Sequence, residues 1–228
     1  MEEGAFVHFC ARTAGDVESV EKQLAADFPS SRVYGATVDI SKPDELSSWV
    51  SSCTGQSGRI DAVVANVSAL AIPNTSENWH KTFNTDVMGT FHLIDLAMAH
   101  LEKTKGNIVA IASVSGRDID FCAPSPYAAM KASIIHYIAQ LAHTLAPKGV
   151  RANTVSPGNT YVADGFWAGA ERDNPDLYNS QLKLNPMGRM ARPEEIANAV
   201  VFLASEKASF ISGQNLNVDG ALCTGVQF

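Results

Sequence analysis

Short apolar runs alternate along the chain with longer segments whose apolar positions recur every three or four residues. The runs are rich in β-branched and aromatic residues, which favour strands. They are "FVHFC", "RVYGATVDI", "DAVVAN", "GNIVAIAS", "VRANTVSPG" and "NLNVDG". The periodic segments between them predict helices over 15–28, 43–53, 77–103 and 127–146.

This alternation of strands and helices predicts an α/β fold, in which a doubly wound parallel sheet has helices on both faces. "DAVVAN" is a continuous apolar run, which is typical of a strand buried on both faces. Before the helix over 43–53, Pro43 suits a first helical turn and Ser41 is a plausible N-cap. With 228 residues, 46% of them apolar, the chain is long enough for a single domain over 1–228 with a sizeable core.

Parallel sheets bind ligands at the carboxyl ends of their strands. Polar and turn-forming residues follow several of the apolar runs, namely Asp39, Asn66, Ser113 and the Pro157–Gly158 pair. We therefore expect these residues to lie at one functional edge of the sheet.

The segment 159–192 is irregular and rich in Gly, Asn, Pro and aromatic residues. It is long for a connection inside a domain, and such segments often form lids or substrate loops. Phe166, Trp167 and Tyr178 in this loop predict a partly apolar pocket wall, or equally an anchor that holds a helical lid to the core.

Composition excludes several classes of function. The net charge of −7 argues against a general attraction to nucleic acid or to an anionic membrane. No run of about 18 apolar residues predicts a membrane span, and no basic and apolar leader indicates secretion. The four cysteines are widely scattered and have no zinc spacing, so we expect free thiols in a reducing, cytoplasmic compartment and no metal site.

The strongest chemical signal is the run "SVSGRDIDFCAPSPYAAMK". Tyr127 and Lys131 are four residues apart at the start of a helix and share a face, and Ser113 ends the preceding strand. A tyrosine acts as an acid or base near neutral pH only when its pKa falls well below about 10, and a nearby ammonium lowers it. Such a pair is common by chance, but the serine, the strand before it and the downstream "NTVSPG" favour proton delivery to a carbonyl group.

From 4 to 228 the chain resembles the short-chain dehydrogenase/reductase family, of the classical type. The resemblance lies in "GAFVHFCAR", "VDIS", "RIDAVVANVS", "GNIVAIASVSG", the Y-x-x-x-K pair, "VRANTVSPGNT", "GRMARPEEIANAVVFLAS" and "SFISGQNLNVDGA", in the family's order. It implies a Rossmann-like three-layer fold, a nicotinamide dinucleotide cofactor, and interconversion of a small carbonyl compound and its alcohol.

The resemblance also implies roles for individual residues. Tyr127 would give or take the proton, Lys131 would lower the pKa of Tyr127 and hold the nicotinamide ribose, and Ser113 would orient the substrate oxygen.

Further residues would bind the cofactor. Gly158 and Thr160 lie in the run that would contact the nicotinamide carboxamide. Asp39 lies where the family holds the adenine, and Asn66 beside the adenosine ribose.

The choice of cofactor follows from the residue after the first predicted strand. In relatives that prefer NAD, an acidic residue there holds the ribose hydroxyl groups, but this chain has Ala11 followed by Arg12. A guanidinium binds a 2′-phosphate that a carboxylate would repel, so we favour NADP over NAD. The alternative is that Arg12 is simply a solvated residue after a strand.

Two positions depart from the family pattern inside the chain. The family's N-N-A-G is "ANVS" here, so Asn66 is kept but Ser68 replaces the glycine. Asp86 stands where the family usually has the asparagine that holds a water in the proton relay. An ionised aspartate only accepts hydrogen bonds, so Asp86 is predicted either to bind that water or to be a solvated helix residue.

A third departure is at the N-terminus, where the family has a first strand followed by the glycine-rich T-G-x-x-x-G-x-G loop that binds the pyrophosphate. Neither is present in this sequence, and "MEEGA" resembles the end of the helix after that loop. We expect about 30 residues of the family pattern to be absent. The second and fourth strands of the family would then lose their shared neighbour.

These departures leave alternatives open. The first is an NADP(H)-dependent oxidoreductase. The second is a non-redox enzyme or a small-molecule-binding protein that keeps the fold but has lost dinucleotide binding. The third, an inactive subunit, is disfavoured by the intact Ser–Tyr–Lys set. By analogy with the family we also expect a homodimer or homotetramer that packs through the helices over 77–103 and 127–146.

Overall fold

The strands form two parallel sheets within residues 4–29 and 32–225, which are the residues that this structure, a computed structural model, describes. In the smaller sheet, β1 (Val7–Ala11) pairs with β2 (Val33–Thr37). The larger sheet has the order β3-β4-β5-β6, formed by β3 (Ala62–Ala65), β4 (Asn107–Ile111), β5 (Arg151–Pro157) and β6 (Asn215–Val218). Every strand pair is parallel, so the predicted α/β, Rossmann-like fold is confirmed.

Helices connect the strands: the four predicted segments form helices, and further helices follow after residue 165. They are α1 (Ala14–Asp27), α2 (Pro43–Ser57), α3 (Ser76–Thr82), α4 (Gly89–Thr104), α5 (Pro126–Leu145), α6 (Phe166–Asp173), α7 (Pro175–Leu184) and α8 (Pro193–Ala204). A π-helical turn, η1 (Phe83–Met88), joins α3 to α4, so the helix expected over 77–103 contains a local widening. The loop over 159–192 forms two short helices, α6 and α7.

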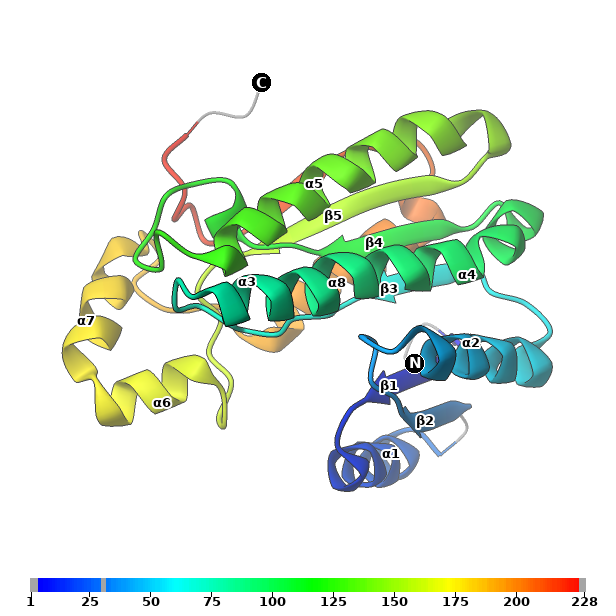
Figure 1. Ribbon diagram of the computed structural model, residues 1–228, viewed down its shortest axis with the longest axis horizontal. Coiled ribbons are helices and arrows are strands. Elements are labelled where there is room, and N and C mark those ends of the chain that lie inside the picture. The colour runs from blue at the N-terminus through cyan, green and yellow to red at the C-terminus, as the bar shows by residue number, and fades with distance from the viewer. Residues whose placement is uncertain (1–3, 30–31, 226–228) are drawn as a thin grey trace.

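Two hydrophobic cores cover the faces of the larger sheet, because successive side chains of a strand point to opposite faces. Ile108 of β4 packs with Ile94 of α4 and Ile138 of α5 on one face. Val109 packs with Leu203 of α8 on the other face. Figure 1 shows α4 and α5 in front of the sheet and α8 behind it.

The expectation that β3 is buried on both faces is wrong. Val63 and Ala65 are buried, but the side chain of Val64 is 43% exposed. Val64 pairs with Val109 and so lies on the face that α8 covers. Helix α8 packs against β4, β5 and β6 rather than β3, which leaves Val64 in contact with solvent.

No strand of the described residues lies between β1 and β3. The two sheets are separate, and Figure 1 shows β1, β2 and α1 as a unit below the larger sheet. In residues 4–29 and 32–225, β1 and β3 therefore have no neighbouring strand in common. The backbone groups on the facing edges of β1 and β3 take no part in a strand ladder.

Candidate active site

Ser113 and Tyr127 are brought together by the end of β4 and the start of α5. Ser113 follows β4 by two residues, and the side chain of the N-cap, Ser125, accepts a hydrogen bond from Tyr127 N at 3.1 Å. Tyr127 therefore lies in the first turn of α5, and Lys131 lies one turn later with its Nζ 5.8 Å from the centroid of the Tyr127 ring.

A glycine fixes the distance between these two elements. The turn η2 (Val114–Gly116) follows Ser113 and packs against α5. A Cβ atom at Gly116 would lie 2.7 Å from Ala132 N, a backbone atom of that helix. Only glycine permits this approach, so Gly116 allows Ser113 to stay beside Tyr127.

Lys131 is a buried cation that is held mainly by backbone carbonyl groups. Its Nζ donates to Val67 O at 2.9 Å and to Ile111 O at 3.0 Å, and its residue exposure is 2%. Burial lowers the pKa of Lys131, and the charge of Asp86 opposes that shift. The two carbonyls come from the ends of β3 and β4, so Lys131 also ties the two strand ends to α5.

Asp86 is completely buried in the π-turn η1. Its Oδ1 accepts a hydrogen bond from Ala69 N at 2.7 Å. Its Oδ2 lies 3.5 Å from Lys131 Nζ and has no hydrogen-bond partner of its own. The alternative that Asp86 is a solvated helix residue is therefore wrong, because the carboxylate faces the Lys131 ammonium inside the site.

The expected lowering of the Tyr127 pKa by Lys131 is not observed. Burial raises the pKa of Tyr127, the charges of Asp86, Cys122 and Asp120 raise it further, and hydrogen bonding with Ser113 opposes the shift. Burial is the largest cause of this rise. The Lys131 ammonium donates its hydrogen bonds to two carbonyl oxygens and faces Asp86.

Sequence reasoning missed two further polar residues of the site. Ser113 Oγ donates to Ser115 Oγ at 3.2 Å, and Ser115 Oγ donates to Asp120 Oδ2 at 2.5 Å. Asp120 Oδ1 also accepts from Cys122 N. Ser115 and Asp120 lie in the same "SVSGRDID" run as Ser113, but only the turn η2 and the loop after it bring the three side chains into a chain of hydrogen bonds.

Arg12 and Asp39 lie at the ends of neighbouring strands. Arg12 follows β1 and is exposed, and Asp39 comes two residues after β2. The pKa of Asp39 is lowered, first by a hydrogen bond from the Ser41 side chain and also by the charges of Lys42 and Arg12. Because Ser41 bonds to Asp39, it does not cap α2, whose N-cap is Lys42; the predicted cap is wrong.

The remaining predicted cofactor residues, Asn66, Gly158 and Thr160, follow β3 and β5 at the same edge as Ser113. Asn66 is exposed. Thr160 Oγ1 donates to Gly158 O at 3.0 Å, and a Cβ atom at Gly158 would lie 2.8 Å from Asp219 Cα.

Between Gly158 and Thr160, the buried side-chain Nδ2 of Asn159 has no hydrogen-bond partner. An unsatisfied donor next to Gly158 and Thr160 fits a polar ligand such as the nicotinamide part of a dinucleotide. In the described residues we find no glycine-rich strand–helix turn that fits the pyrophosphate.

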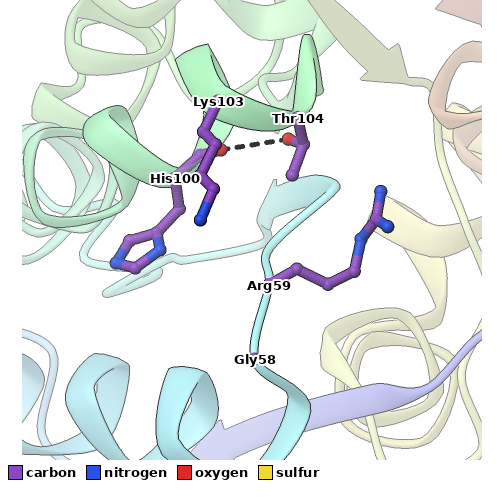
Figure 2. Close-up of a pocket in the computed structure, with 5 residues that line it drawn as sticks. All are labelled: Gly58, Arg59, His100, Lys103 and Thr104. Atoms are coloured by element: carbon purple, nitrogen blue, oxygen red, sulfur yellow. Dashed lines mark hydrogen bonds between the residues drawn. The ribbon is translucent and has the colours of Figure 1, made fainter.

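A separate hollow of about 350 Å³ lies at the amino-terminal edge of the larger sheet. It is lined by Gly58, Arg59, His100, Lys103 and Thr104. Figure 2 shows the side chains of His100 and Lys103 extending from α4 toward the loop with Gly58 and Arg59. It contains none of the predicted site residues. We therefore assign the chemistry to the opposite edge, where Ser113, Tyr127 and Lys131 meet.

Two further features bear on function. In residues 4–29 and 32–225, no group of three or more His, Cys, Asp and Glu side chains is arranged to hold a metal ion. Among the helices of the same residues, none is both long and apolar enough to span a membrane.

Ser113, Tyr127 and the buried Lys131 thus lie at the carboxyl edge of a parallel α/β sheet. A family model described as enoyl-(acyl carrier protein) reductase matches residues 1–222. The chain belongs to the short-chain dehydrogenase/reductase family, as the sequence predicts, and it is an enzyme that catalyses a carbonyl/alcohol redox reaction.

Individual relatives agree with this assignment. Isoepoxydon dehydrogenase patN of Penicillium expansum is 36% identical over 230 residues, which cover 100% of this chain and 89% of that protein. Among solved structures, 7α-hydroxysteroid dehydrogenase complexed with NADH and 7-oxo glycochenodeoxycholic acid has a TM-score of 0.85 and 26% identity, covering 96% of this chain and 84% of the other. An NADPH-bound short chain oxidoreductase from Pseudomonas aeruginosa PAO1 has a TM-score of 0.87 and 26% identity, covering 99% of this chain and 90% of the other.

Proposed function

We propose that this protein interconverts a small carbonyl compound and its secondary alcohol with NADP(H) as the cofactor. The observation that carries the proposal is the meeting of the Ser113 hydroxyl and the Tyr127 phenol beside a buried lysine. When bound, the nicotinamide would give or take a hydride. The residues of this chain would do the rest of the chemistry.

Tyr127 gives a proton to the substrate oxygen during reduction and takes it back during oxidation. Because its pKa is raised, the phenol is protonated near neutral pH and is ready to act as the acid. Ser113 orients the substrate oxygen beside the phenol: its oxygen accepts from the substrate hydroxyl group in oxidation, and its proton turns from Ser115 to the carbonyl oxygen in reduction. Lys131 and Asp86 stand behind Tyr127 as a buried ion pair, and Asp86 Oδ2 has free acceptor capacity for a relay water.

Arg12 supports the choice of NADP. It is an exposed cation directly after β1, and its charge acts on Asp39 at the end of the neighbouring strand. On this proposal Arg12 binds the 2′-phosphate, Asp39 and Asn66 hold the adenosine, and Gly158 and Thr160 contact the nicotinamide.

The proposal is tested by titrating the purified chain with NADPH and with NADH and by comparing the KM values in a screen of alcohols and ketones. We expect NADPH to bind more tightly than NADH. We expect Arg12→Ala to reduce this preference for NADPH about tenfold. Arg59→Ala is the matched control, because Arg59 is exposed at the opposite edge and pairs with Asp61. A clear preference for NADH would contradict the role of Arg12. Failure to bind either dinucleotide would favour the alternative of a non-redox enzyme or small-molecule-binding protein of this fold.

We further propose a cytoplasmic homodimer or homotetramer. The support for association is the partly exposed Phe91 of α4, whose ring centroid lies 6.4 Å from that of Tyr137 on α5. The four free cysteines suit a reducing compartment. Light scattering on the purified protein tests the oligomer, and a monomer at micromolar concentration would contradict it.

A further inference from the structure

The hydroxyl protons near Ser113 are oriented by a carboxylate. Asp120 is half-buried and, when ionised, can only accept hydrogen bonds. It therefore draws the proton of Ser115, and Ser115 in turn accepts the proton of Ser113. The oxygens of this chain of hydrogen bonds still have free lone pairs, which can accept a hydrogen bond from a ligand. A hydroxyl group on the carbon next to the reacting carbon can donate that hydrogen bond.

The groups around this chain of hydrogen bonds disfavour an anionic ligand. Lys131 is paired with Asp86 behind the phenol. The Arg117 guanidinium lies 3.8 Å from the Asp118 carboxylate and donates to Gly225 O. Among the described residues no cation pairs with the Asp120 carboxylate, and its charge acts on Tyr127 as well. A neutral ligand avoids repulsion by this charge.

A cluster of aromatic rings begins at the residue after Asp120. Phe121 follows Asp120 in the chain, and its ring centroid lies 6.1 Å from Phe166 and 5.3 Å from Trp167 at the start of α6. Phe121 is 37% exposed and Phe166 is 44% exposed, whereas Trp167 is buried beneath them. The loop that follows Ser113 therefore carries both hydrogen-bond acceptors and an exposed aromatic ring, a combination that suits a ring compound with hydroxyl groups on one edge.

We propose that the substrate is a small neutral ring compound with a hydroxyl group on the carbon next to the reacting carbon, and that Asp120 and Ser115 select that hydroxyl group. This inference rests on the proposed function. In the oxidation direction, the C–H bond of one carbinol breaks and its electron pair leaves as a hydride to the oxidised nicotinamide. The O–H proton leaves through Tyr127 to the solvent, and the products are a 2-hydroxyketone and the reduced nicotinamide. The neighbouring hydroxyl group is unchanged.

The test compares trans-cyclohexane-1,2-diol with cyclohexanol. Binding is measured by isothermal calorimetry, and oxidation by kcat/KM with NADP. The wild-type protein is expected to prefer the diol by about tenfold or more, because a hydrogen bond to a charged group is lost with the monoalcohol. Asp120→Asn and Ser115→Ala should each remove most of this preference. Asp176→Asn, at the exposed start of α7, is the matched control and should keep it.

The outcomes distinguish a failure of the inferred substrate class from a failure of the proposed redox reaction. Equal binding of the two compounds to the wild-type protein would overturn the inference, and so would a full preference in folded Asp120→Asn. If Asp120→Asn fails to fold, Ser115→Ala decides, since it removes only one hydroxyl group. Selective binding of the diol without oxidation by NADP or NAD would overturn the proposed function but leave the selection by Asp120 standing.

Discussion

The Asp86 carboxylate lies 3.5 Å from the Lys131 ammonium, and both side chains are almost completely buried. An isolated charge in such a place is strongly disfavoured, so the two groups depend on each other. The negative charge of Asp86 also raises the pKa of Tyr127, because it disfavours the negatively charged phenolate.

Removing the negative charge should make Tyr127 more acidic. In Asp86→Asn the side-chain amide oxygen still accepts from Ala69 N, and activity should be retained if binding of a relay water is the only requirement. The pKa of Tyr127 should fall, because the charge of Asp86 is one cause of its rise. The measurement is a phenolate absorbance titration, with Tyr127→Phe in each background subtracted. An unchanged or higher pKa would contradict this role of Asp86.

The raised pKa of Tyr127 predicts how stability depends on alkaline pH. Because the folded-state pKa lies above the unfolded value of about 10, the contribution of Tyr127 to stability is fully present below about pH 10. It is lost as the pH rises through the folded-state pKa. Urea unfolding of the wild-type protein and of Tyr127→Phe from pH 8 to pH 11 should show the wild type weakening relative to the variant at the upper end. If the difference in unfolding free energy between the two proteins stayed constant over this pH range, a raised pKa of Tyr127 would be contradicted.

Breaking the ion pair should destabilise the fold strongly. Asp86→Ala leaves the Lys131 ammonium buried without a charged partner, and we expect a loss of about 3–5 kcal/mol in the free energy of unfolding. Asp86→Ala combined with Lys131→Met should recover part of that loss, because no buried charge is left unpaired. Additive losses in this double-mutant cycle would show that the two groups do not interact.

Two glycines give opposite predictions for the same substitution. Gly158→Ala places a Cβ atom 2.8 Å from Asp219 Cα, so it should cost about 1–3 kcal/mol and displace Thr160. Gly169→Ala meets open space within α6, so it should stabilise the protein by up to about 1 kcal/mol. Thermal unfolding of both variants checks this, and equal effects would contradict the close approach at Gly158.

The strands, the four helical segments before residue 147, and the Ser113, Tyr127 and Lys131 set could be predicted because local patterns encode them. Apolar runs marked the strands, and a spacing of four put Tyr127 and Lys131 on one helical face. The direction of the Lys131 ammonium could not be predicted, because it depends on carbonyl groups at Val67 and Ile111 that the fold brings from two strand ends.

Other features depended on tertiary neighbours in the same way. The exposure of Val64 follows from where α8 packs, which no pattern within "DAVVAN" records. The link from Ser113 through Ser115 to Asp120 needs the loop after η2 to fold back. The predicted roles of Arg12, Asp39, Asn66 and Thr160 toward a cofactor stay predictions.

The central claim is that Tyr127 transfers the proton in a carbonyl/alcohol redox reaction. The most direct test follows the absorbance of the reduced nicotinamide while the wild-type protein and Tyr127→Phe act on the same panel of alcohols and ketones. We predict that the wild type turns over at least one compound, with one cofactor consumed per product, and that Tyr127→Phe loses about 10³-fold in kcat while keeping its fold. Equal turnover by both proteins would contradict the claim.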